Sequence, residues 1–146
     1  MSAVAQVTKG GPRTYTPAEQ ILGGQLVEGR AASRIGVAAA GSVKVLGVAL
    51  TDAINPEAVV TTPVTTAGRP VLNAAAFPVR VAVAYAGDEV KVTYTAAAAF
   101  GDALQAAALG QVTPVTVATA DARSIVGRCT EPAGVAAGAV GLMRIA

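Results

Sequence analysis

The feature that most constrains the fold is an alternation of large apolar side chains with small or polar ones, which occurs twice between residues 79 and 95. The alternating residues are Val79, Val81, Val83 and Tyr85 in the first run, and Val90, Val92 and Tyr94 in the second. A period of two is typical of a β-strand with one buried face. Because Ala86-Gly87-Asp88-Glu89 between the runs resembles a tight turn, the sequence predicts a β-hairpin over 79–95.

Other short segments of β-branched residues, bounded by Gly, Pro or Asp, are also predicted to be strands. They cover residues 25–28, 42–50, 102–105, 112–117, 124–129 and 142–145. In the β-branched run 59–66, Pro63 indicates an edge strand or an extended loop. We therefore predict an all-β fold, a compact antiparallel β-sandwich or barrel.

Three blocks of the sequence recur in the same order later in the chain. Residues 13–18 resemble 92–97, residues 23–26 resemble 101–104, and residues 45–53 resemble 125–133, at offsets of 79, 78 and 80. This pattern indicates a duplicated β unit, with pseudo-repeats over 13–53 and 92–133 joined by the 79–95 hairpin. It favours a strand at 102–105, although the alanines of 96–109 prefer helix. Chance similarity in a chain rich in Ala, Val and Gly is the alternative.

The sequence predicts a short N-terminal arm followed by one domain with a core of small side chains. Gly10-Gly11-Pro12 separates a short N-terminal arm, residues 1–12, from a single β domain over 13–146. Two interpretations of the arm stay open: a frayed terminus, or a strand that pairs with a neighbouring chain. The chain has 34 Ala and 22 Val but only two Phe, three Tyr and no Trp. Side chains this small bury little area, so we expect stability to come partly from partners or further copies.

Residues that usually carry enzyme chemistry are scarce. Without His, the chain lacks the usual general base, every His-dependent triad and the commonest metal ligand. The adjacent carboxylates Asp88 and Glu89 belong to the predicted turn, where an Asp bonds to the local backbone. The glycines of 36–43 have phosphate-loop spacing, but Ser42 stands where that motif needs Lys. We expect no enzyme activity, no cofactor and no metal.

The single cysteine, Cys129, excludes an intrachain disulfide and is consistent with synthesis in a reducing cytoplasm. Its neighbour Arg128 would activate an accessible thiol, but we expect a buried thiol in a strand.

Charge and hydropathy limit the classes of partner. The net charge is +2, and the eleven cations form no basic run with interleaved aromatics, so we expect no nucleic-acid binding. Apolar stretches all fall short of the about 20 residues that a spanning helix needs, so we expect no membrane insertion. The first residues lack the pattern of a signal peptide. Eight of the eleven cations are Arg, which either solubilise the surface or dock the chain on an acidic one.

Taken in order, six segments resemble the capsid decoration (cement) proteins of tailed bacteriophages, particularly those of actinobacterial phages. The segments are Tyr15-Thr16-Pro17, Gly24-Gln25-Leu26-Val27, Gly47-Val48-Ala49, residues 86–92, Phe100-Gly101-Asp102-Ala103-Leu104 and Ile125-Val126-Gly127-Arg128-Cys129. The resemblance runs from about Arg13 to Ile145. No single motif in it is diagnostic.

This resemblance implies a structural virion protein on the outer surface of the phage head. It implies a homotrimer at three-fold and quasi-three-fold positions that binds the major capsid protein and stabilises the mature lattice. The arm would then add a strand to the capsid protein, which makes Val4, Val7, Lys9 and Arg13 the candidate contact residues. A tail, baseplate or surface-adhesin β module is the alternative, although such sites usually present more aromatics.

Overall fold

The computed structural model describes residues 11–59, 64–71, 78–116 and 118–146. In these residues it has twelve β-strands and three single-turn 3-10 helices. The strands are β1 (Arg13–Tyr15), β2 (Leu26–Gly29), β3 (Ile35–Val37), β4 (Val45–Ala49), β5 (Val64–Thr66), β6 (Arg69–Val71), β7 (Val81–Ala84), β8 (Glu89–Thr93), β9 (Ala103–Ala106), β10 (Val112–Pro114), β11 (Ile125–Cys129) and β12 (Val140–Ile145). The 3-10 helices are η1 (Pro56–Ala58), η2 (Ala108–Gly110) and η3 (Ala122–Ser124).

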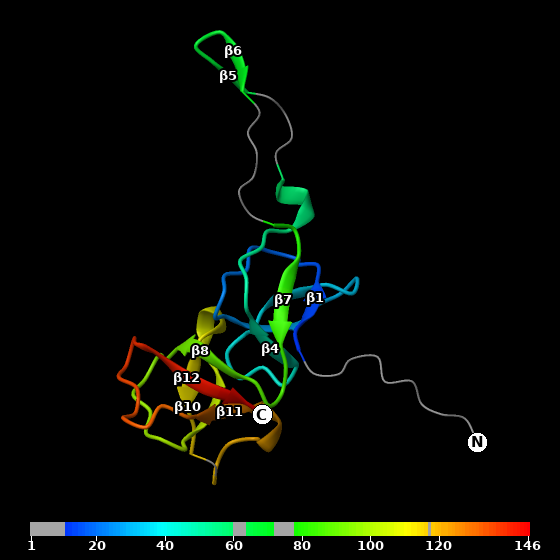
Figure 1. Ribbon diagram of the computed structural model, residues 1–146. Helices are drawn as coiled ribbons and strands as arrows, with labels where there is room; N and C mark the ends of the chain where they lie inside the picture. The colour runs from blue at the N-terminus through cyan, green and yellow to red at the C-terminus, as the bar shows by residue number, and fades with distance from the viewer. Residues whose placement is uncertain (1–10, 60–63, 72–77, 117) are drawn as a thin grey trace, which may run out of the picture.

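Ten of the strands form two antiparallel sheets of five, which confirms the predicted all-β sandwich (Figure 1). The first sheet has the order β1-β7-β4-β2-β3, and the second has the order β10-β9-β11-β12-β8. The remaining strands, β5 and β6, pair only with each other. In the predicted segment 59–66, the structure describes the strand at 64–66, and residues 60–63 lie outside the described residues.

The two sheets repeat one arrangement. Read from β8, the second sheet has the order β8-β12-β11-β9-β10, which matches β1-β7-β4-β2-β3 strand for strand. A parallel bridge between Pro17 and Ile35 recurs between Tyr94 and Val112, both 77 positions later. The pairing between β2 and β4 shifts register by one residue, and the pairing between β9 and β11 shifts at the equivalent place.

This backbone correspondence differs slightly from the sequence alignment. The sequence blocks align at offsets of 79, 78 and 80. In the structure the first two regions correspond at 77, and the third corresponds at 80, where Gly47 matches Gly127. The predicted boundaries of the repeats and the division into arm and domain stay predictions. Below, the first sheet with its loops is called the first unit, and the second sheet with its loops is called the second unit.

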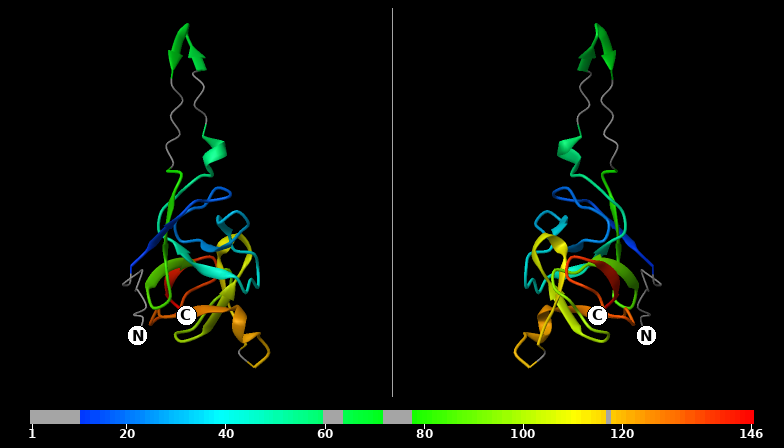
Figure 2. Two further views of the ribbon diagram at one scale, coloured as in Figure 1. Left: turned by 90° about the vertical axis from the view of Figure 1, so that its right-hand side faces the viewer. Right: turned by 90° about the vertical axis from the view of Figure 1, so that its left-hand side faces the viewer.

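The predicted hairpin over 79–95 is wrong in its pairing, although both of its strands exist. Strand β7 pairs with β1 and β4 in the first sheet, whereas β8 pairs with β12 in the second. The turn between them is a corner that carries the chain from one sheet to the other (Figure 2). Backbone hydrogen bonds between this corner and Ile145 hold it on β12. Alternation reports that a strand has one buried face, but it does not identify the partner strand.

The buried side chains form two clusters. One lies within the first unit and contains Ile21, Val27, Ile35, Ala49, Ala53, Val81 and Val83. The other fills the second unit around Tyr94, Leu104 and Met143, and it also includes Leu26 and Val48 of the first sheet. The first sheet therefore buries both faces, one within its own unit and the other against the second unit.

A single carboxylate, that of Glu28 on β2, is buried among the described residues. Its Oε1 lies 3.2 Å from Nη2 of Arg30, and the Ala39 N–H donates to Oε2 at 3.3 Å. Burial raises the pKa of Glu28, but the Ser42 hydroxyl, the Ala39 N–H and the charges of Arg30 and Lys44 outweigh it. The pKa is therefore lowered from 4.5.

We expect Glu28→Gln to lower the free energy of unfolding by about 1 kcal/mol near neutral pH, because it removes charge-assisted hydrogen bonds. A carboxyl group with a lowered folded pKa stabilises the protein above its unfolded pKa of 4.5, and this contribution is lost as the pH falls through the folded value. Urea unfolding of both proteins at about pH 7 and about pH 3 should show the difference shrinking in acid. The exposed Glu89→Gln variant is the control, and a difference that stayed constant with pH would contradict the role given to the Glu28 charge.

Candidate functional site

The outer surface of the second sheet carries charged side chains where the first sheet is apolar. In the first sheet, Leu26, Val48 and Ala84 are neighbours across β2, β4 and β7, and all three are buried. At the equivalent places in the second sheet, Ala103, Arg128 and Arg144 are neighbours across β9, β11 and β12. Glu89 of β8 follows next to Arg144 in the same row. Both arginines and Glu89 are exposed.

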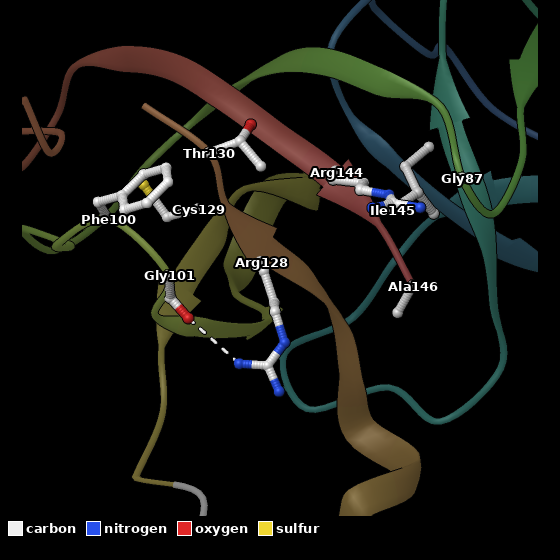
Figure 3. A pocket seen from close by; sticks show the side chains of 9 residues that line it. All are labelled: Gly87, Phe100, Gly101, Arg128, Cys129, Thr130, Arg144, Ile145 and Ala146. Atoms are coloured by element: carbon white, nitrogen blue, oxygen red, sulfur yellow. Dashed lines mark hydrogen bonds between the residues drawn. The ribbon is translucent and has the colours of Figure 1, made fainter. Parts of the chain in front are cut away.

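Arg128 and Arg144 stand directly opposite each other in the register of β11 and β12. Nη1 of Arg128 donates to the Gly101 carbonyl oxygen at 3.2 Å (Figure 3). Among the described residues, no ion pair includes Arg128, Arg144 or Glu89. The two guanidinium groups lie apart in Figure 3, with that of Arg128 at the Gly101 carbonyl oxygen.

A shallow depression of about 530 Å³ lies beside the two arginines (Figure 3). Its lining residues are Gly87, Phe100, Gly101, Arg128, Cys129, Thr130, Arg144, Ile145 and Ala146. Phe100 is 65% exposed although it is one of only two phenylalanines in the chain. We call Phe100, Arg128, Arg144 and the depression between them the arginine face. Its chemistry suits an anionic group that is flanked by apolar atoms.

Of the four residues proposed as capsid contacts, only Arg13 is among the described residues. Val4, Val7 and Lys9 lie outside the described residues. Arg13 is exposed in β1, an edge strand that pairs with β7, and its guanidinium lies 5.6 Å from the centre of the Tyr15 ring. The Tyr15 and Tyr85 hydroxyls share a hydrogen bond, and their rings meet edge to face. Arg13 therefore belongs to a small aromatic cluster at a sheet edge and is not among the residues that line the depression.

The remaining candidates have structural explanations. Asp88 lies in the corner between the sheets, and Glu89 begins β8. Gly36 lies within β3, and Gly41 has a φ of +69° in the turn before β4, so no phosphate loop forms there. Cys129 is buried, as the sequence predicts.

A metal-binding cluster and a membrane-spanning helix are both absent from the described part of the chain. Its His, Cys, Asp and Glu side chains include no group of three that could hold a metal ion. None of its helices has the length and apolar character needed to cross a membrane.

The arginine face was not predicted from the sequence. In the sequence Arg128 stands out only as the neighbour of Cys129, and Arg144 is one of eight arginines that form no run. Arg128 and Arg144 become neighbours only because β11 pairs with β12. The alignment of the two repeats places Arg128 at the position of the buried Val48, and this replacement of an apolar residue by a charged one is the sequence signal for the face.

Comparison with known proteins gives a likeness of fold and no match of sequence family. No family model matches the chain, and no curated protein matches it. A crystal structure of the N base of the head fiber protein gp8.5 of bacteriophage phi29 is similar, with a TM-score of 0.59. The match covers 92% of each chain at 15% sequence identity. At this identity the likeness shows a shared fold over the matched part of the chain.

Proposed function

We propose that the chain is a structural virion protein that binds the outer surface of a phage head and stabilises the mature capsid lattice. The observation that carries this proposal is the fold likeness, over nearly the whole chain, to the base of a phage head fiber protein. The six ordered segments that resemble phage decoration proteins support it independently. In finer detail we propose a homotrimer that contacts the major capsid protein, and a chain with no enzyme activity.

Binding of the subunit would stabilise the mature capsid by mass action. A subunit that binds the mature lattice more tightly than a looser precursor shifts the equilibrium toward the mature shell. The small side chains support this role, because the monomer leaves apolar residues exposed that contact with copies or with a shell would cover. Exposed examples are Leu22, Val43, Leu50, Leu109 and Val140.

The proposal is tested with the purified protein and phage heads that lack it. Light scattering should give three times the 14.3 kDa mass of one chain, and cosedimentation should show saturable binding to heads at micromolar concentration. Heads that carry the protein should withstand heat or low salt better than bare heads. No binding at micromolar concentration would count against the function, whereas a monomer that binds would count only against the trimer.

A further inference from the structure

We propose that the arginine face is the surface with which this chain docks on an acidic segment of its partner. In this arrangement Arg128 and Arg144 receive carboxylate groups, and Phe100 packs against an apolar side chain next to them. The inference rests on the proposed function, because it names the face that meets the shell and the chemistry of the segment bound there.

The first argument comes from comparing the two units. They have the same strand order, so equivalent positions can be compared directly. In the first sheet, the row that contains Val48 and Ala84 is buried against the second unit. The equivalent positions in the second sheet, Arg128 and Arg144, are exposed and charged. The free face is therefore suited to a polar contact rather than to the apolar packing that joins the units.

The second argument is electrostatic. Arg128 and Arg144 are paired residues of β11 and β12, and neither guanidinium group makes an ion pair with a described carboxylate. In Figure 3 the two guanidinium groups lie apart, so each can take a carboxylate of its own. An incoming acidic segment gives each guanidinium a carboxylate partner that it lacks among the described residues. Arginine is suited to that role because its planar group binds carboxylates through two parallel hydrogen bonds. Side chains directly opposite on paired strands are close enough for both arginines to contact one acidic segment.

The third argument separates a protein partner from a nucleic acid. Glu89 lies in the same row, next to Arg144, so a partner has to keep its negative groups at the arginines and away from Glu89. Separate carboxylates of a peptide can be placed in this way, whereas a polyphosphate carries its charge continuously. The net charge of the whole chain is only +2, whereas nucleic-acid binding surfaces carry a strong basic patch. The exposed Phe100 supplies apolar contact area in the lining of the depression, and an aromatic that becomes buried beside arginine on binding is typical of a protein–protein contact.

The test compares three proteins in cosedimentation with heads: wild type, the Arg128→Gln/Arg144→Gln double variant, and a charge-matched Lys44→Gln/Arg80→Gln control. Both control residues are exposed and belong to the first unit, Lys44 directly before β4 and Arg80 directly before β7. We expect the control to bind like wild type and the double variant to bind at least about tenfold more weakly. Wild-type binding should also weaken as salt is added. Circular dichroism confirms that each variant is folded.

Each other outcome has a definite meaning. If wild type binds heads and the double variant binds equally well, the arginine face is not the docking surface, although the function stands. If wild type does not bind, the proposed function itself fails. Tight binding of an oligothymidine of about 20 nucleotides that the double variant loses would reassign the face to nucleic acid. Loss of the oligomer in the double variant would reassign it to contacts between copies. Either reassignment overturns the proposal.

Discussion

Gly47→Ala is expected to lower the free energy of unfolding by more than about 3 kcal/mol, a large part of the stability of a small domain. Gly47 lies in β4, with β2 on one side and β7 on the other. A Cβ atom at this position would overlap the Ala84 carbonyl oxygen and would approach Cγ1 of Val83 to 3.0 Å. The overlapping atom belongs to the backbone of a paired strand, so it cannot move aside without breaking the sheet.

The matched control is Gly29→Ala in the neighbouring strand β2, where the nearest atom to an added Cβ is Cδ1 of Leu46 at 4.0 Å. We expect the free energy of unfolding of that variant to lie within about 0.5 kcal/mol of the wild-type value. Urea denaturation followed by circular dichroism measures both. The equivalent change in the second unit, Gly127→Ala, should also be severe, because its Cβ would overlap the Arg144 carbonyl oxygen. A loss below about 1 kcal/mol at Gly47 would show that the sheet adapts to the added methyl group.

Tyr94→Ala is expected to lower the free energy of unfolding by about 3–5 kcal/mol, because it empties the position of a large buried side chain. The Tyr94 side chain is fully buried in the cluster that fills the second unit, and its hydroxyl donates to the Leu142 carbonyl oxygen at 2.8 Å. Most other side chains in this core are small, so they have few rotamers with which to fill the cavity. Calorimetry of wild type, Tyr94→Ala and Tyr94→Phe measures the loss.

The phenylalanine variant separates the hydroxyl from the ring. It keeps the packing and loses one hydrogen bond, so we expect a loss of about 1–2 kcal/mol near neutral pH. Burial, with the neighbouring Cys129 thiol and the Glu131 charge, raises the pKa of Tyr94 well above its ordinary value of 10.0. A raised folded pKa means that this stabilisation is complete below pH 10.0 and is lost as the pH rises beyond it. Tyr94→Phe should therefore weaken the alkaline fall in stability, and an unchanged fall would contradict this role.

Local patterns predicted where the strands lie. The predicted strands at 25–28, 102–105 and 124–129 overlap β2, β9 and β11, each within a residue at either end. The alanine-rich stretch 96–109 contains β9 rather than a long helix, although alanine favours helix. The comparison with 23–26 pointed to this strand because equivalent units place strands at equivalent positions. Successive side chains of a strand point to opposite faces, so alternation within a few residues shows which side chains are buried.

By itself, then, the sequence determined an all-β fold, the positions of most strands and a core of small side chains. Only the tertiary structure decided that β7 and β8 enter different sheets, and that Arg128 stands opposite Arg144 on a free face. The physical reason is that side-chain periodicity is set within a few residues, whereas strand pairing is set by contacts between segments far apart in the chain. The arginine face, to which β11 and β12 contribute, exists only once those segments have met.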